Sequence, residues 1–317
     1  MKRRDLLAVL AALPLPALAF PQHAVRIVVP YSVGVGPDVV ARAVAEQLRQ
    51  RWNQPVVVDN KPGASGIVAF GDVRRTAPDG HTLYLADTAT MAVNPLLHAS
   101  LPYDPARDLV PLSLLFRATF MLWTGGDNRL RTLAALIDAA RREPGRVSYA
   151  TLGNGHASHV AVETFARAAD LKLLHVPFKD AGSLFMAVAS GEVDFTAFSA
   201  NTVAGLAARG KLRALAVAAR QRVPAHGDVP TIVEAGGPPV EMHPWAALVA
   251  VAGTPQPLLD RLQADIVAAL QAPEVRGLAE QTGFEITPSS PAALRERIAQ
   301  DTAAYAPLVA EGRIARF

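Results

Sequence analysis

Two glycine-containing segments are the parts of this sequence best suited to bind a small molecule. Residues 31–38 read YSVGVGPD and residues 151–156 read TLGNGH, and each lies between a predicted strand and a predicted helix. A helix that starts there presents free N–H groups and the positive end of its dipole to an anion, and glycine lets the backbone approach closely. Neither segment contains Lys or Arg. We therefore expect amides and hydroxyls, rather than cations, to hold an anion.

Each segment alone has a simpler interpretation, because glycines open helices in many α/β proteins. Gly34-x-Gly36 lacks the third glycine and the acidic residue of a dinucleotide-binding fingerprint. Asp38 is expected to be an N-cap that accepts hydrogen bonds from the first-turn amides of its helix. Taken singly, either loop is better interpreted as a tight strand-to-helix turn.

His156 and His159 are candidates for metal binding or acid–base chemistry, because their spacing places them near one face of a helix. A metal would need a third and usually a fourth ligand, and the chain has no cysteine and no His-Glu-x-x-His motif. No Gly-x-Ser-x-Gly elbow occurs, and Ser158 beside His159 does not make a triad. We expect no metal and no cofactor. The histidines should line a polar cleft or hydrogen-bond at a helix terminus.

The composition describes a folded protein with two domains. The chain has 317 residues, of which 50% are hydrophobic and 19% are charged, and this excludes intrinsic disorder. A net charge of +3 and a pI near 9.4 suggest a nucleic-acid partner. The adjacent arginines Arg74-Arg75 and Arg141-Arg142 are isolated pairs, however, so we expect solvated surfaces and no nucleic acid.

Residues 1–19 have the features of an export signal. Lys2-Arg3-Arg4 precedes an apolar run that is too short and too proline-rich to span a bilayer, and the run ends in Ala17-Leu18-Ala19. We expect a cleaved leader and a periplasmic protein. Arg3-Arg4 leaves open whether export follows the Sec or the twin-arginine route. Cleavage removes three cations and one anion, so the mature chain is almost neutral.

Strands and helices alternate along the mature chain, which favours an α/β fold with a mostly parallel sheet. Two strand–loop–helix units start about 120 residues apart, and we interpret them as two domains of similar design. The predicted strands are residues 26–29, 56–58, 82–85, 147–150, 173–176, 193–198, 212–217 and 245–251, and the best-defined helices are residues 40–48, 257–270 and 291–308.

Several short motifs follow one another in a specific order. They are residues 26–42, 54–64 (QPVVVDNKPGA), 77–83 (APDGHTL), 94–95, 101–105 (LPYDP), 108–111 (DLVP), 149–155, 175–179 (HVPFK), 210–216 (GKLRALA) and 228–231 (DVPT). In this order the chain resembles the Bug family, the extracytoplasmic solute receptors of tripartite tricarboxylate transporters. The resemblance covers nearly the whole mature chain.

The resemblance implies a type II periplasmic-binding-protein fold, with two α/β domains around a ligand cleft. The first domain would comprise residues 20–123 and 244–317, and the second residues 124–243. A non-enzymatic receptor of this kind would grip a small organic carboxylate and deliver it to integral-membrane transporter subunits, and we expect it to be a monomer. The expected ligand-binding residues are Tyr31, Ser32, Gly34, Val35, Gly36, Asp38, Thr88, Thr90, Thr151, Gly153, Asn154, Gly155, His156, Ser158, His159, Phe198, Ser199 and Trp245.

Two departures from the family pattern bear on the ligand. The usual Gly-Gly pair of the first loop is Gly34-Val35 here, and the frequent Phe-Asp-Asn after residues 193–194 aligns with Ala197-Phe198-Ser199. An acid that could hold a ligand amine is therefore absent. This disfavours an amino acid and favours a carboxylate with an apolar or aromatic body.

Two other functions remain open at this point. The protein could present its ligand to a sensor kinase instead of a transporter, and the sequence does not separate these roles. It could also be an exported hydrolase or transferase that uses His156 or His159 as a base, although a nucleophile motif is missing.

Overall fold

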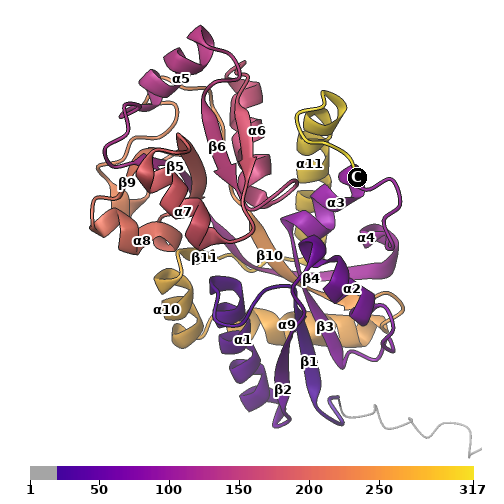
Figure 1. Cartoon of the computed structure of the whole chain (residues 1–317). Helices are drawn as coiled ribbons and strands as arrows, with labels where there is room; N and C mark the ends of the chain where they lie inside the picture. The colour runs from indigo at the N-terminus through magenta and orange to yellow at the C-terminus, as the bar shows by residue number, and fades with distance from the viewer. Residues whose placement is uncertain (1–19) are drawn as a thin grey trace, which may run out of the picture.

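The computed structural model describes residues 20–317, and these form two lobes that are each built on one β-sheet (Figure 1). The expected leader, residues 1–19, lies outside the described residues. Within residues 20–317, no helix is both long and apolar enough to cross a membrane.

The first lobe contains six strands in the order β11-β4-β10-β3-β1-β2. They are β1 (Val25–Val29), β2 (Val56–Asn60), β3 (Thr82–Asp87), β4 (Leu109–Ala118), β10 (Trp245–Val251) and β11 (Phe284–Ile286). β1 pairs in parallel with β2 and β3, whereas β10 is antiparallel to β3 and β4, and β11 is antiparallel to β4.

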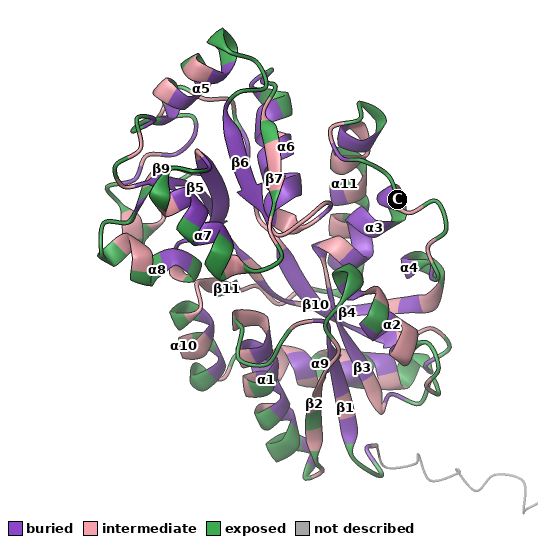
Figure 2. Cartoon of the chain, viewed as in Figure 1, coloured by how far each residue is buried: buried purple, intermediate pink, exposed green. Residues whose placement is uncertain are grey.

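Two apolar clusters cover the two faces of this sheet, because side chains alternate along each strand. Ile27, Leu83 and Leu248 point to one face, where they meet three helices, and Val28 and Tyr84 point to the other. The first face is covered by α1 (Gly36–Trp52), α9 (Gln256–Leu270) and α10 (Pro273–Gln281), and the second by α2 (Ile67–Val73) and part of α11 (Pro291–Ala310). Figure 2 shows the buried inner strands of this sheet, beneath helices with exposed outer faces, whereas the edge strand β2 is less buried.

The second lobe has five strands in the order β7-β6-β8-β5-β9. They are β5 (Phe120–Gly125), β6 (Ser148–Thr151), β7 (Leu174–Pro177), β8 (Phe195–Ser199) and β9 (Leu212–Val217). β6 is parallel to β7 and β8, and β5 is antiparallel to β8 and β9. One face packs on α5 (Leu133–Arg142) and α6 (Ala157–Ala168), and the other on α7 (Ala181–Ser190) and α8 (Ala200–Ala208). Short connections include α3 (Asn94–Leu97), α4 (Pro105–Asp108), a π-helical turn (Ala89–Val93) and 3-10 turns at Ala64–Gly66 and Pro224–His226.

Two segments cross side by side between the lobes. The Ala118 N–H donates to the Pro244 carbonyl at 2.8 Å, and the Phe120 N–H donates to the Met242 carbonyl at 3.0 Å. After each crossing the chain starts a strand, β5 or β10, at the edge that faces the other lobe. Because β5 and β10 begin at this edge, they run antiparallel to their neighbouring strands, which end at it. The sheets are therefore mixed, and not mostly parallel as the alternation of elements suggested.

All the strands predicted from the sequence occur, with ends that differ by a residue or two. The sequence did not reveal β4, β5 or β11. The expected change of domain between residues 123 and 124 falls inside β5, which pairs along its length in the second sheet.

Candidate functional site

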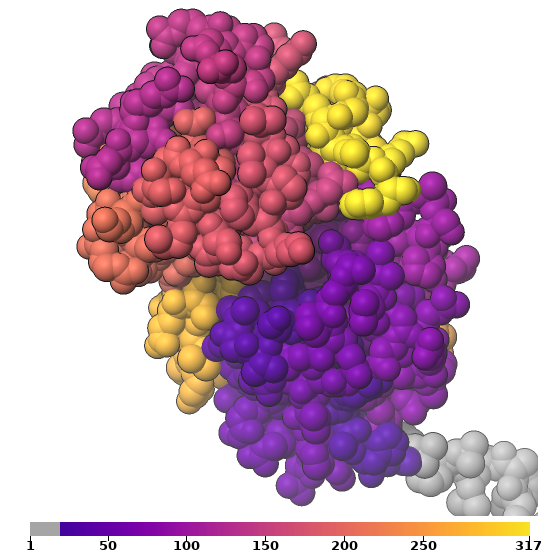
Figure 3. Space-filling model, viewed as in Figure 1, coloured from indigo at the N-terminus to yellow at the C-terminus, as the bar shows by residue number. Residues whose placement is uncertain are grey.

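The candidate residues lie along the edges of the two sheets that face each other. β1, β2 and β3 end at Val29, Asn60 and Asp87 on this edge, and β6 and β8 end at Thr151 and Ser199 on the opposing edge. The surface is hollowed between the two lobes (Figure 3). The loops that follow these strands therefore surround the furrow, where open α/β sheets commonly bind ligands.

The first loop, residues 30–35, leaves its backbone open at one glycine. Gly34 has a left-handed backbone with φ +83°, and no heavy atom lies within 4 Å of the position where a side chain would start. Ser32 and Val35 are exposed beside it. Gly36 differs, because a Cβ there would lie 2.8 Å from the ring of Phe284. The backbone at Gly34 is therefore open to a ligand, whereas the absence of a side chain at Gly36 allows Phe284 to pack there.

Asp38 does not cap α1 as expected. The helix begins two residues earlier, so Asp38 lies inside its first turn. Its carboxylate accepts hydrogen bonds from Gly34 N at 2.8 Å, Arg42 Nε at 2.9 Å and Asn60 Nδ2 at 2.8 Å. Burial acts to raise the pKa of Asp38, but these hydrogen bonds outweigh it and leave the pKa below its ordinary value. Asp38 holds the loop against β2 and is buried beneath it.

A carboxyl group that the sequence analysis overlooked lies at the end of β3. Asp87 Oδ2 accepts a 2.5 Å hydrogen bond from the Tyr31 hydroxyl, and Oδ1 accepts from the N–H and the hydroxyl of Thr90, each at 2.8 Å. Burial raises the pKa of Asp87, and the hydrogen bonds from Tyr31 and Thr90 oppose this only in part. Tyr31 and Thr90, both predicted to bind ligand, are therefore held together by the Asp87 carboxylate.

The side chain of Thr88 contacts the backbone of Trp245. The Trp245 N–H donates to Thr88 Oγ1 at 3.0 Å where β10 leaves the crossing. The indole Nε1 donates to Asp301 of α11 at 2.6 Å, and Arg297 Nε holds the same carboxylate at 2.9 Å. The Trp245 side chain is therefore buried between β10 and α11, and its N–H is already bonded.

In the second loop, backbone amides donate hydrogen bonds to nearby side chains of the same segment. The Gly153 N–H donates to Thr151 Oγ1 and the Gly155 N–H donates to His159 Nδ1, each at 3.2 Å. His156 is the N-cap of α6, and its Nδ1 accepts from the Ser158 N–H at 3.1 Å. This matches the helix-terminal role expected for His156. Fewer amides are left for a ligand here than the glycine pattern suggested.

Both histidines of this loop are neutral. Burial lowers the pKa of His156 to about 4. Burial, with smaller contributions from His175 and His156, lowers the pKa of His159 to about 3. His159 is buried and stacks on His175 with ring centroids 3.9 Å apart. His159 supports the loop from inside the second lobe. Because His156 and His159 are both neutral, they offer no positive charge to an anion.

Phe198, near the end of β8, lies close to His156, and Ser199 is the last residue of that strand. The rings of Phe198 and His156 have centroids 6.2 Å apart, and Trp123 Nε1 donates to the Phe198 carbonyl at 2.9 Å. Ser199 is the N-cap residue of α8, but its side chain makes no cap hydrogen bond and lies 2.8 Å from Thr202 Oγ1. The start of α8, like that of α1, therefore lacks a side-chain cap.

The lobes touch near these loops. Thr88 and Ala157 line one cavity of about 30 Å³, enough for a water molecule. A Cβ on Gly155 would lie 2.4 Å from Leu97 Cδ1 of α3, so glycine permits the close approach of the second loop to the first lobe. Asn154 Nδ2 donates to the Ala315 carbonyl at 2.8 Å, so this side chain is engaged with the C-terminal segment.

Residues 40–312 match the model of the tripartite tricarboxylate transporter family receptor. The chain belongs to this receptor family.

Curated relatives and solved structures agree with this assignment. The chain is 32% identical over 297 residues to a UPF0065 protein of Pseudomonas sp. strain P51, covering 93% of this chain and 88% of that protein. It is 31% identical over 301 residues to BugT of Bordetella pertussis, covering 95% and 92%. A structure from R. palustris with adipate has a TM-score of 0.83 and 28% identity, covering 94% and 100%. MatC of Rhodopseudomonas palustris with bound malate has a TM-score of 0.79 and 28% identity, covering 91% and 99%. The fold of the receptor is that of a two-lobed periplasmic binding protein.

His156 and Ser158 form a serine–histidine contact, which bears on the enzyme alternative. His156 Nδ1 lies 2.8 Å from Ser158 Oγ and 3.1 Å from Ser158 N. A general base works best with a pKa near the ambient pH, whereas that of His156 is about 4. The hydrogen bonds describe a capped helix, and the family is one of solute receptors.

The structure extends the predicted site in two places. Asp87 at the end of β3 and Asn60 at the end of β2 hold the first loop, through Tyr31 and Asp38. Both positions could have been noticed, since each is a polar residue two positions after a predicted strand and the carboxyl ends of parallel strands share an edge. What the sequence lacked was the pairing of β1 between β2 and β3.

Proposed function

We propose that this chain is a periplasmic receptor that captures a small organic carboxylate and delivers it to the membrane subunits of a tripartite tricarboxylate-type transporter. Its family membership supports the transport role. Two similar structures are described with adipate and with malate, both small dicarboxylates. The proposal includes the absence of enzymatic activity and action as a monomer.

The observation that carries the ligand class is the pair of helix starts without side-chain caps. α1 begins after Val35 and α8 begins after Ser199, and neither of these residues makes a side-chain cap hydrogen bond. The first amides of a helix need acceptors, and a carboxylate oxygen can supply them. Each dipole contributes about 0.3–1 kcal/mol, so several hydrogen bonds must add to reach about −8 kcal/mol, the value for micromolar binding.

The side chains around these helix starts favour a ligand with an apolar body. Phe198 lies beside Phe120, with ring centroids 5.8 Å apart, and Val35 is exposed on the opposite loop. His156 is neutral, and Asp38 is already paired with Arg42. We propose a carboxylate with an aliphatic or aromatic body and no ligand amine, because the Asp38 carboxylate is paired with Arg42 and the Asp87 carboxylate is held by Tyr31 and Thr90.

Two further parts of the proposal concern the limits of the mature protein and its lobes. We propose that residues 1–19 direct export and are removed, so that the mature chain starts at Phe20. Because β5 and β10 follow the crossings, we place the first lobe at residues 20–118 and 244–317 and the second at residues 119–243. The mass of the protein recovered from the periplasm tests the cleavage position.

A thermal-shift screen of the purified protein against mono-, di- and aromatic carboxylates tests the ligand class. A ligand at a hundred times its dissociation constant should stabilise the folded state by about 2.7 kcal/mol. Matched amides and amines of the same carbon skeletons serve as controls. The proposal predicts that the carboxylate raises the melting temperature and its amide does not. It is wrong if no carboxylate does so or if the amides act equally well.

A pair of glycine variants tests the location of the site. Gly34 and Gly145 both have left-handed backbones, with φ +83° and +80°, and both face open space. Leucine at either position should cost about 1–2 kcal/mol of stability through backbone strain. Gly34→Leu should in addition weaken carboxylate binding at least about tenfold, or about 1.4 kcal/mol, whereas Gly145→Leu should leave affinity unchanged. Calorimetric titration measures both, and equal affinities would place the ligand away from the first loop.

A further inference from the structure

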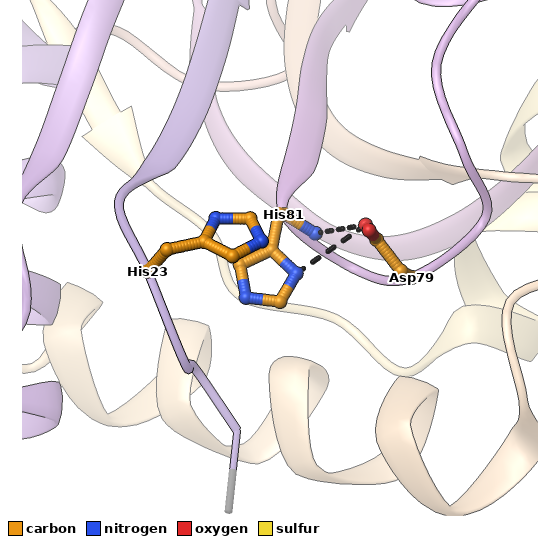
Figure 4. Close-up of side chains that lie close together, drawn as sticks. All are labelled: His23, Asp79 and His81. Carbon is orange, nitrogen blue, oxygen red and sulfur yellow. Dashed lines mark hydrogen bonds and ion pairs between the residues drawn. The ribbon is translucent and has the colours of Figure 1, made fainter.

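A second cluster of ligating side chains lies at the end of the first lobe away from the furrow. His23 precedes β1, and Asp79 and His81 precede β3. β1 and β3 are adjacent and parallel, so their starting ends share one edge, opposite the edge that carries the ligand loops. Figure 4 shows the His23 ring lying against the His81 ring, with the Asp79 side chain beside His81.

The geometry brings one nitrogen or oxygen atom from each of the three residues within 4.8 Å of the others. The rings of His23 and His81 stack with centroids 3.7 Å apart, and His81 Nδ1 lies 3.3 Å from Asp79 Oδ1. His81 Nδ1 is buried and has no hydrogen-bond partner among the described residues. Asp79 Oδ1 accepts from the His81 N–H at 2.9 Å, which fixes the carboxylate toward the ring.

We propose that His23, Asp79 and His81 bind a divalent transition-metal ion of the zinc type. Two imidazoles and one carboxylate are ligands that Zn²⁺ accepts, and three protein ligands leave a fourth position for water. His81 Nδ1 is buried and lacks a hydrogen-bond partner within residues 20–317. If its lone pair coordinates a metal ion, the free-energy cost of leaving this atom unbonded is removed. The cluster is independent of the proposed transport function.

Coordination requires a small rearrangement. Ligand atoms around a tetrahedral ion with bonds of about 2.0–2.1 Å lie about 3.3–3.5 Å apart, so the atoms must approach by up to about 1.5 Å. The exposed His23 ring must turn out of the stack so that its lone pair points at the ion. Coordination through His81 Nδ1 moves the ring proton to Nε2 and ends the 3.3 Å contact from the Gln22 N–H. The segment that moves, residues 22–24, is exposed.

The bound ion would join the start of the mature chain to the turn before β3. Phe20 packs against His81, with ring centroids 4.9 Å apart, and against Trp52 of α1 at 5.5 Å. An ion on His23 adds a bond between this segment and the sheet. We therefore expect the metal to protect residues 20–24 from an aminopeptidase as well as to raise the melting temperature.

The probe is Zn²⁺, added by calorimetric titration to untagged protein that has been stripped with a chelator. The expected result is one ion per chain with a dissociation constant below about 10 µM, equivalent to about −7 kcal/mol. His23→Gln and Asp79→Asn should each weaken binding at least about tenfold. Both side chains are exposed, so neither change should disturb the fold.

His226→Gln is the matched control, because His226 lies in a 3-10 turn of the second lobe and outside the cluster. This variant should bind Zn²⁺ as the wild type does, and His23→Gln should bind carboxylates as the wild type does. The proposal is overturned if the wild type binds no Zn²⁺, or if His23→Gln and Asp79→Asn both retain full affinity. His175 lies in the histidine stack of the second lobe. The proposal is also overturned if His175→Gln abolishes Zn²⁺ binding while His23→Gln and Asp79→Asn do not.

Discussion

At the scale of single residues, two aspartates of the same loop system have opposite environments. Asp38 receives hydrogen bonds from a guanidinium, an amide N–H and a side-chain amide, and its pKa falls below the ordinary value. Asp87 is bonded to Tyr31 and Thr90 without a cation, and burial raises its pKa. The ionised form of Asp38 therefore stabilises the folded state, whereas ionisation of Asp87 destabilises it.

The Asp87→Asn variant should be more stable than the wild type at neutral pH. A carboxyl whose folded-state pKa is raised binds its proton more tightly when folded, so its contribution declines as pH rises from about 3.9 through the folded pKa. Asparagine keeps an oxygen for Thr90 and removes the charge. Denaturant melts at several pH values between 4 and 8 should show a gain in the free energy of unfolding that grows with pH. A pH-independent difference would mean that Asp87 does not titrate in this range.

The Asp38→Asn variant should behave in the opposite way. Its lowered pKa gives stability that is present above about pH 3.9 and is lost as the pH falls through the folded pKa. Loss of the charge-assisted bond to Arg42 should cost about 1.5–3 kcal/mol at pH 7. The same denaturant melts check this, and an unchanged stability at pH 7 would contradict the role assigned to Asp38.

At the scale of elements, the three helix starts around the furrow are not equivalent. α6 carries its own cap, His156, whereas α1 and α8 carry none. Glycines precede the starts of α1 and α6, and this pattern made both starts candidate anion sites. Glycine before a helix shows only that the backbone can turn, and whether the amides are free depends on side chains that fold back, as His156 does.

Removing the cap of α6 should affect both stability and binding. His156→Ala deletes the acceptor for the Ser158 N–H and should cost about 1 kcal/mol of stability. Because the α6 start adjoins the furrow, carboxylate affinity should fall as well. Thr132→Ala is the control, since Thr132 caps α5 through the Ala135 N–H at 3.1 Å. That change should cost similar stability without loss of affinity, as measured by thermal melts and calorimetry.

Two of the three strands that the sequence did not reveal, β4 and β5, are buried along most of their length. β5 is buried at every position, and β4 at most of its positions, so neither shows the alternation of a half-buried strand. Pro111 also lies inside β4. The register between β4 and β10 shifts next to Pro111, and such an irregularity tolerates a residue without an N–H. The strand β1 was predictable, because its short β-branched run ends at a turn.

At the scale of the whole molecule, contacts on two sides of the furrow hold the lobes in one arrangement. Asn201 of α8 donates to the carbonyls of Glu280 and Gln281 at the end of α10, at 2.8 and 2.9 Å. On the other side, Arg313 bonds Glu163 of α6 at 3.2 Å. The paired crossings between these contacts have the geometry of a hinge.

Asn201→Ala should shift the molecule toward a more open arrangement. Two hydrogen bonds of about 1 kcal/mol each are lost, so the equilibrium between closed and open forms should change by roughly tenfold or more. Small-angle scattering without ligand should give a larger radius of gyration. Asn128→Ala is the control, because Asn128 bonds Leu130 and Asp194 within the second lobe. Identical scattering of both variants would show that Asn201 does not restrain the lobes.

The sequence by itself determined the class of fold, most of the strands and the two glycine loops, because short-range patterns and turn residues act locally. It also predicted Tyr31, Thr88, Thr90, His156 and Phe198 as ligand-binding residues, and this remains a prediction. Only the tertiary structure decided that Asp87 meets Tyr31, that Trp245 turns into α11, and that His23 meets Asp79 and His81. These contacts join residues far apart in the chain. They depend on which strands are neighbours and on how two crossings order the sheets, and spacing along the sequence carries neither.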